Sequence, residues 1–168
     1  MERNDQFGGS SLPLIAQSGL KLSLLLVIAP FYKEITSLLL EGAISKLRAG
    51  GINYKVIEVP GALEIPPAIK LASTSESNSF DGYVALGCVI RGETIHFEIV
   101  AQESARGIMD LGVNGLCIGN GIITVENTSQ ALARANPQEG NKGGEAVEAA
   151  LRLILLQQGA IQPEDIIS

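Results

Sequence analysis

Apolar residues fall into four short and nearly continuous runs, which are separated by polar and glycine-containing segments. Each run has the length of a strand, and an unbroken apolar sequence is typical of a strand that is buried on both faces of its sheet. The pattern therefore predicts four strands, over residues 22–29, 54–59, 83–90 and 116–125, of which the first is expected to be buried on both faces.

Between and after these runs, apolar residues recur at intervals of three and four, the spacing of one face of an α-helix. Pro66-Pro67 suits a helix start, and Gly50-Gly51 and Gly112 suit helix ends. Asn127, with Gln130 three residues later, resembles a capping box. We expect helices over residues 35–47, 66–74, from the turn at 91–94 to 111, 127–135 and 145–158.

Strands that alternate with helices form right-handed βαβ units and a parallel sheet. The chain is therefore expected to be an α/β protein with a four-stranded parallel sheet between helices on both faces. Ligands of such sheets bind at the carboxyl ends of the strands. A sheet of four strands is narrow and has exposed edges, which favours self-association.

The composition supports one domain and narrows the classes of partner. The 168 residues can form a sizeable core, and 46 % of them are hydrophobic against 18 % charged. A formal net charge of −6 argues against nucleic acid or an anionic membrane as the main partner. Cys88 and Cys117 lie in apolar runs and are interpreted as buried free thiols. Because the chain has one histidine, no metal site is predicted.

The two ends of the chain are predicted to lie outside the domain. Residues 1–18 lack the basic start and apolar core of a signal peptide, and we interpret them as a flexible leader. Residues 19–160 form the expected domain, and 161–168 a loose tail. The longest apolar run, 22–30, is too short to cross a bilayer. A soluble, cytoplasmic protein is therefore expected.

The strongest candidate chemistry lies in residues 87–100, where a predicted strand passes through a short turn containing Gly92 into a helix. Unpaired N–H groups at such a helix start, with the positive end of the helix dipole, suit an anion such as phosphate. Thr94 adds a hydroxyl there, and His96 adds a group that can carry protons near neutral pH. Many strand–turn–helix units bind nothing, however, and a single histidine is more often structural than catalytic.

Four segments taken together resemble the 6,7-dimethyl-8-ribityllumazine synthase family of riboflavin biosynthesis. They occur in the order and at the intervals of that family, and only the leader and tail lie outside the resemblance. The segments are Val59-Pro60-Gly61-Ala62-Leu63-Glu64-Ile65-Pro66, the stretch 87–100, Gly121-Ile122-Ile123-Thr124-Val125-Glu126-Asn127 with Gln130 and Arg134, and Asn141-Lys142-Gly143 with Glu145.

The resemblance implies a flavodoxin-like three-layer sandwich that assembles into homopentamers, or into decamers or larger shells, with active sites between subunits. It implies a transferase that condenses 5-amino-6-(D-ribitylamino)uracil with 3,4-dihydroxy-2-butanone 4-phosphate, giving the lumazine, phosphate and water. No metal and no redox cofactor would take part.

The resemblance also implies roles for thirteen residues, and it leaves Arg91 unassigned. His96 would be the catalytic proton carrier, and Arg134 would reach the phosphate from an adjacent subunit. The pyrimidine and its ribityl chain would be bound by Phe31, Ala62, Leu63, Glu64, Val89, Ile90, Asn120 and Lys142. The ketone phosphate would be bound by Gly92, Glu93, Thr94 and Arg134, with the carboxylate of Glu93 pointing away.

Two departures from the family pattern bear on affinity and assembly. Many members carry an aromatic residue at the position of Asn120, which would stack on substrate where an amide cannot. The loop 136–140 lacks the Gly/Lys-rich sequence of shell-forming members, which favours pentamers or pairs of pentamers.

Two other functions remain open on the sequence. One is a carrier that binds flavin or lumazine without turnover, against which His96, Arg134 and Lys142 argue. The other is a general mononucleotide-binding module, which leaves residues 60–66 and 141–143 unexplained.

Overall fold

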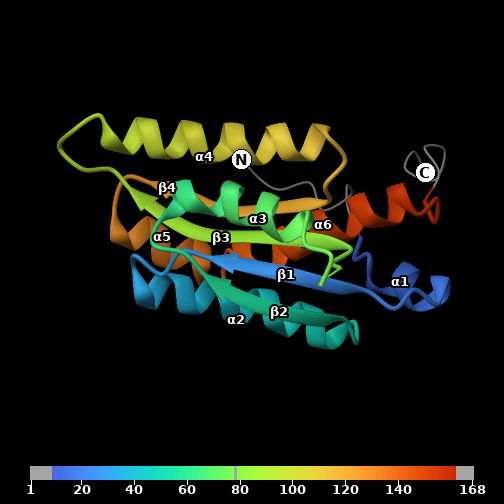
Figure 1. Ribbon diagram of the computed structural model, residues 1–168. Helices are drawn as coiled ribbons and strands as arrows, with labels where there is room; N and C mark the ends of the chain where they lie inside the picture. The colour runs from blue at the N-terminus through green and yellow to red at the C-terminus, as the bar shows by residue number, and fades with distance from the viewer. Residues whose placement is uncertain (1–8, 78, 162–168) are drawn as a thin grey trace.

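The computed structural model describes residues 9–77 and 79–161, and the sheet in it has four parallel strands in the order β2-β1-β3-β4. Figure 1 shows α3 and α4 on one face of the sheet and α2 and α6 on the other. The predicted α/β class and the four-stranded parallel sheet are confirmed. The elements are α1 (Leu12–Ser18), β1 (Ser23–Ile28), α2 (Lys33–Ala49), β2 (Asn53–Glu58), the 3₁₀ turn η1 (Ala62–Glu64), α3 (Ile65–Ser73), β3 (Gly82–Ile90), α4 (His96–Val113), β4 (Ile118–Val125), α5 (Thr128–Ala135) and α6 (Lys142–Gln157).

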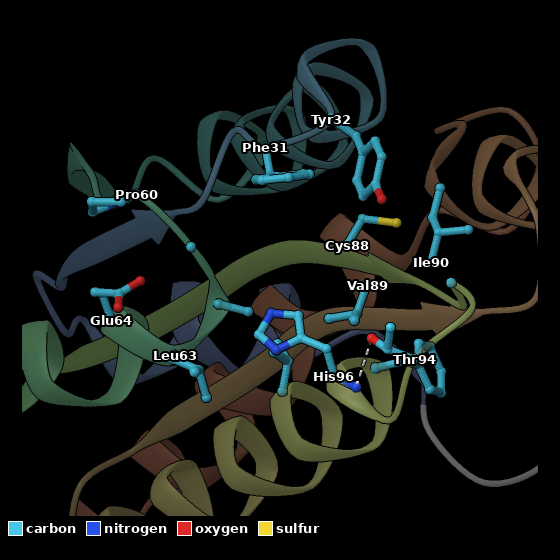
Figure 2. A pocket seen from close by; sticks show the side chains of 15 residues that line it. Phe31, Tyr32, Pro60, Leu63, Glu64, Cys88, Val89, Ile90, Thr94 and His96 are labelled. Carbon is cyan, nitrogen blue, oxygen red and sulfur yellow. Dashed lines mark hydrogen bonds between the residues drawn. The ribbon is translucent and has the colours of Figure 1, made fainter.

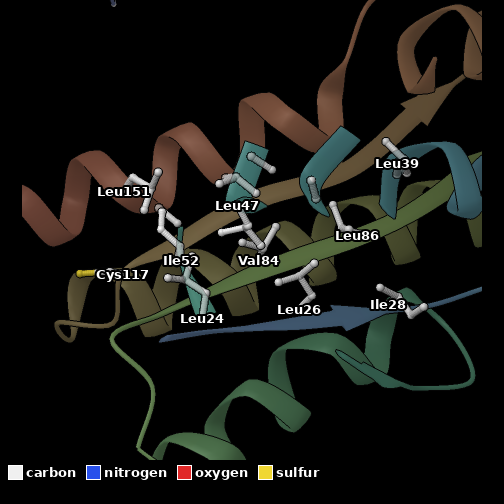
Figure 3. Packing of buried hydrophobic residues seen from close by; sticks show 14 of the residues in the cluster. Leu24, Leu26, Ile28, Leu39, Leu47, Ile52, Val84, Leu86, Cys117 and Leu151 are labelled. Carbon is white, nitrogen blue, oxygen red and sulfur yellow. The ribbon is translucent and has the colours of Figure 1, made fainter. Parts of the chain in front are cut away.

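The central strand β1 separates two apolar layers, because successive side chains of a strand point to opposite faces. Leu24, Leu26 and Ile28 pack with α2, α5 and α6 in the larger layer, part of which is seen in Figure 3. Leu25 and Val27 pack on the other face with α3 and α4. Burial on both faces explains why the strand has no polar alternation.

Glycines inside β4 allow helix α6 to approach the sheet closely. A methyl group on Gly119 would overlap the carbonyl oxygen of Ala146 in α6, and one on Gly121 would lie 2.9 Å from the carbonyl oxygen of Ala85. Gly143 makes the same kind of contact with the carbonyl of Leu39 in α2. These glycines mark the approach of another backbone, one of the two explanations that a strand glycine suggests.

Two helix boundaries differ from the sequence expectation. Helix α4 continues through Gly112 to Val113, and Gly115, directly after the C-cap residue Asn114, has φ 101°. The N–H of Gly115 donates to the carbonyl of Gly112 and that of Leu116 to the carbonyl of Leu111, a Schellman arrangement that only the second glycine can complete. The same helix begins at His96, which is therefore its first residue.

Helix α6 begins at Lys142, three residues before the expected start. The side chain of Asn141 accepts a hydrogen bond from the N–H of Gly144 at 3.2 Å and so caps a first turn that contains two glycines. The predicted cap of α5 is confirmed, since Asn127 accepts from the N–H of Gln130 at 3.0 Å. The side chain of Gln130 returns to the N–H of Glu126, one residue before the cap.

The amino-terminal segment is not simply a leader, because residues 12–18 form α1, whose Ile15 is buried. The carboxylate of Glu148 in α6 holds the start of this helix. It accepts hydrogen bonds from the N–H of Ser11 at 2.8 Å and from its hydroxyl, and it pairs with Lys46 at 2.6 Å and Arg152 at 3.2 Å. Residues 1–8 of the expected leader and 162–168 of the expected tail lie outside the described residues.

The contact at Gly119 predicts that a single added methyl group strongly destabilises the fold. Gly119→Ala should lower the free energy of unfolding in urea by about 3 kcal/mol, the upper part of the range for overpacking a core. Gly112→Ala is the matched control, because no atom lies within 4 Å of the added methyl and the site is helical. It should leave stability unchanged or raise it by up to about 1 kcal/mol. Equal stabilities of the two variants would contradict the close packing of α6 on β4.

The contacts of Glu148 predict a dependence of stability on pH. Burial raises the pKa of Glu148, but hydrogen bonds from Lys46 and Ser11 outweigh this and hold the pKa below its usual range. A lowered pKa stabilises the fold above the ordinary glutamate value of about 4.3, and this contribution disappears as pH falls through the folded pKa. Thermal unfolding should show that Glu148→Gln is less stable at pH 7 and loses less stability in acid. Glu41→Gln, at an exposed position of α2, is the control.

Candidate active site

A cavity of about 440 Å³ opens at the carboxyl ends of β1, β2 and β3, at the edge of the sheet expected for a ligand (Figure 2). This volume suits a small organic ligand. It is lined by Phe31, Tyr32, Pro60, Gly61, Ala62, Leu63, Glu64, Cys88, Val89, Ile90, Gly92, Thr94, His96, Phe97 and Val100. Nine of the thirteen residues predicted for the site are therefore brought together on one cavity.

Phe31 and Tyr32 form one side of the cavity, directly after β1. The ring of Phe31 is 73 % exposed, and its edge-to-face contact with Tyr32 has a centroid distance of 5.1 Å and an interplanar angle of 72°. An aromatic face that is held by a neighbouring ring and open to solvent can stack on a planar heterocycle. Its exposure argues against a role as a core aromatic residue.

The segment after β2 forms a second wall. The N–H of Glu64 donates to the carbonyl of Gly61 at 3.1 Å and closes the turn η1. Ala62 is buried against Val89 and Val100, while the side chains of Leu63 and Glu64 stay exposed. The turn thus presents backbone groups and one carboxylate to the cavity, a combination that suits a ligand with several hydroxyl groups.

The opposite side of the cavity is the start of α4. Figure 2 shows the imidazole of His96 reaching in between Leu63 and Val89, with Thr94 beside it. The hydroxyl of Thr94 accepts a hydrogen bond from the N–H of His96 at 3.3 Å. The positive end of the helix dipole therefore faces the same space as the imidazole, so that an anion and a group losing or gaining a proton could lie side by side.

The charges of the cavity wall are few. Glu64 and His96 line it, but no lysine or arginine does among the described residues. Burial raises the pKa of the Cys88 thiol to about 11, so this wall residue stays protonated near neutral pH and is a poor nucleophile. An anionic ligand would meet the helix dipole here without a cation from the same wall.

Four of the predicted residues lie outside this cavity. Glu93 stands in the turn with its side chain outside the wall, as its charge suggested. Asn120 lies on β4, where its side-chain oxygen accepts from the N–H of Ile122 at 3.0 Å. Arg134 donates to the carbonyl of Gln130 within α5 at 3.1 Å, and Lys142 pairs with Glu145 at 2.5 Å.

Six residues of the cavity wall were absent from the predicted set, namely Tyr32, Pro60, Gly61, Cys88, Phe97 and Val100. Each lies within two residues of a predicted residue or one helical turn from one. The shared helix face of Phe97 and Val100 is visible in the sequence, whereas its orientation toward a cavity is not.

Within residues 9–77 and 79–161, no group of three or more His, Cys, Asp or Glu side chains could hold a metal ion. Cys88 and Cys117 are buried and free, as predicted. No helix in the same residues is long and apolar enough to cross a membrane.

Fold and cavity together define an α/β protein with a ligand-sized site at the carboxyl edge of a parallel sheet. Comparison with known proteins shows to which family within this class the chain belongs. The sequence pattern of the 6,7-dimethyl-8-ribityllumazine synthase family matches residues 21–158. Because the match covers most of the chain, the protein belongs to this family, as its motifs indicated.

Curated relatives carry the same name. The 6,7-dimethyl-8-ribityllumazine synthase of Novosphingobium aromaticivorans is 58 % identical over 134 residues, which cover 80 % of this chain and 95 % of the relative. That of Bartonella bacilliformis is 59 % identical over 136 residues, covering 80 % and 90 %. That of Sphingopyxis alaskensis is 56 % identical over 134 residues, covering 80 % and 94 %.

Proposed function

We propose that the protein condenses 5-amino-6-(D-ribitylamino)uracil with 3,4-dihydroxy-2-butanone 4-phosphate, and so makes 6,7-dimethyl-8-ribityllumazine in the cytoplasm. The observation that carries the proposal is the meeting of an exposed aromatic ring, a helix start and one imidazole around a single cavity in a chain of this family. Phe31 stacks on the pyrimidine, and Ala62, Leu63 and Glu64 meet the ribityl chain. Backbone groups at Val89 and Ile90 bind the pyrimidine edge.

The reaction needs proton transfer at each of its stages. The 5-amino group and the ketone form a C=N bond and release water. The carbon beside this bond then loses a proton, and the C–O bond to phosphate breaks with its electron pair leaving on phosphate, which gives an enol. The enol takes up a proton at its terminal carbon and loses one from its hydroxyl, and so becomes a ketone with a new methyl group. Finally the nitrogen that bears the ribityl chain attacks the new carbonyl and releases a second water. His96 carries protons in the first two stages, because its imidazole can donate and accept near neutral pH.

The phosphate binds at the start of α4, through Gly92, the hydroxyl of Thr94 and the helix dipole. This half-site lacks a cation among the described residues of its wall, and the predicted phosphate ligand Arg134 lies elsewhere on the same chain. We therefore propose that Arg134 and Lys142 of a neighbouring subunit complete each site. A guanidinium can bind a phosphate through two parallel hydrogen bonds, which the backbone of α4 alone cannot offer.

Exposed apolar side chains on the α3–α4 face support assembly. Ile99, Met109 and Val113 of α4 are 46 %, 64 % and 75 % exposed, and Leu71 of α3 is 73 % exposed. Neighbouring apolar groups left in water favour burial against another copy. We propose a homopentamer, alone or in pairs, with a mass in solution of five or ten times the 17.6 kDa of one chain.

Purified protein given both substrates and no cofactor should form lumazine and phosphate in equal amounts, followed by absorbance and a phosphate assay. His96→Ala should lower kcat by on the order of 10²-fold, the usual worth of a positioned proton carrier. Binding of pyrimidine or flavin without product would indicate a carrier instead. Wild-type turnover in the His96→Ala variant would remove this residue from the mechanism.

Arg134→Ala should raise the KM for the phosphorylated ketone far more than that for the pyrimidine, since it removes a charge-assisted contact. If sites lie between subunits, co-expressed His96→Ala and Arg134→Ala chains should regain activity. Some interfaces of the mixed oligomer then combine an intact His96 with an intact Arg134. Activity of the mixture no higher than the mean of the two parents would show that both residues serve the same subunit.

A further inference from the structure

Arg91, which the family resemblance leaves unassigned, joins three elements around the cavity without lining it. It directly follows β3, and its Nε donates to the carboxylate of Glu126, just after β4, at 2.8 Å. Its Nη1 donates to the carboxylate of Glu98 in the first turn of α4. The guanidinium carbon also lies 4.3 Å from the ring centre of Phe97, a residue of the cavity wall.

These contacts hold the guanidinium in one orientation. A single exposed ion pair would contribute little, because water and salt screen it. Here, however, a planar group with a fixed fork of donors reaches two carboxylates and stacks on an aromatic face, which few side-chain conformations allow. The hydrogen bond from Arg91 also lowers the pKa of Glu98, so the pair stays charged at the pH of the reaction.

The turn that Arg91 controls has few other anchors. At its first residue, the N–H of Arg91 donates to the carbonyl of Val125 at 3.0 Å. At its end, the N–H of Ile99 donates to the carbonyl of Ile95. The side chains from Gly92 to His96 are exposed, so no core packing fixes them. Together with the packing of Phe97 against Val89 and Val100, the contacts of the Arg91 side chain therefore fix how the turn and the first turn of α4 lie relative to the sheet.

The contact of Arg91 with Glu126 also links Arg91 to the helix that carries Arg134. Glu126 precedes Asn127, which caps α5, and the N–H of Glu126 donates to the side chain of Gln130 in the first turn of that helix at 3.0 Å. Helix α5 carries Arg134, the proposed phosphate ligand of the neighbouring site. Arg91 thus ties the start of α4 to the start of α5.

We infer that Arg91 is a positioning residue: by clamping Glu98 to Glu126, it fixes the phosphate-binding turn and His96 in the geometry that the proposed reaction requires. This inference rests on the proposed function of the cavity. A displacement of about 1 Å in such a constellation can lower a rate by on the order of 10²-fold. Arg91 need not touch substrate to have this effect.

The test compares Arg91→Met, Arg91→Lys, Glu98→Gln and Glu126→Gln with Arg48→Met, an exposed arginine at the far end of α2. Steady-state kinetics with both substrates give kcat and each KM, and calorimetry gives the Kd of inorganic phosphate. Arg91→Met should lower kcat about 10–100-fold and weaken phosphate, while the KM for the pyrimidine changes little. Arg91→Lys, which keeps the charge and one ion pair, should recover part of the loss, and Arg48→Met should behave as wild type.

A double-mutant cycle separates positioning from direct contact. If Arg91 acts through the carboxylates of Glu98 and Glu126, Glu126→Gln should lower kcat as Arg91→Met does. Adding Glu126→Gln to Arg91→Met should then lower kcat no further. Full activity of Glu98→Gln and Glu126→Gln beside an inactive Arg91→Met would mean that Arg91 touches the substrate itself, and the inference would be wrong. Wild-type kcat in Arg91→Met would overturn it as well.

Two controls keep the outcome decisive. Oligomer size and thermal unfolding show whether Arg91→Met folds, and if it does not, Arg91→Lys and Glu126→Gln carry the comparison. If the wild-type protein makes no lumazine, the proposed function fails on its own. The Kd of inorganic phosphate then still tests the role of Arg91. A positioning role requires weaker phosphate binding in Arg91→Met than in the wild type, and an unchanged Kd excludes that role.

Discussion

The structure depends on the contact of α6 with its neighbours, where backbone meets backbone without side chains between. Gly119 lets β4 approach Ala146, and Gly143 lets α6 approach Leu39 of α2. Such contacts leave little room for sliding, because a carbonyl cannot change rotamer to accommodate a neighbour. They fix the position of the α6 start, and with it Lys142. The face of the sheet that carries α2 and α6 is therefore rigid, and it supports the start of α6.

The other face, which carries α3, α4 and part of the cavity wall, is held differently. Its wall rests on a small cluster of Ala62, Val89 and Val100, with Phe97 packed against it. Apolar side chains can shift against one another, whereas two backbones in direct contact cannot. The ion pairs of Arg91 with Glu98 and Glu126 therefore add rigidity on this face, whereas the other face is already rigid. The site combines a rigid sheet edge with a turn whose geometry needs its own support.

Strands β1 and β3 could be predicted because burial on both faces leaves an unbroken apolar sequence. Helix ends were harder, since Gly112 and Gly115 look alike until their hydrogen bonds are known. The local part of the site was predictable because its residues are neighbours in sequence. The clamp was not, because Arg91 and Glu126 are 35 residues apart and charged surface residues carry no mark of their partner.

Asn120, where the family resemblance suggested an aromatic residue, has a reason in the fold. Strand β4 lies at the edge of the sheet, where unpaired N–H groups invite pairing with other chains. The side chain of Asn120 turns back along its own strand and accepts from the N–H of Ile122. An aromatic ring could cover a substrate but could not satisfy that donor. The amide thus satisfies one donor at an exposed edge of the sheet, and Phe31 remains the exposed aromatic ring of the cavity.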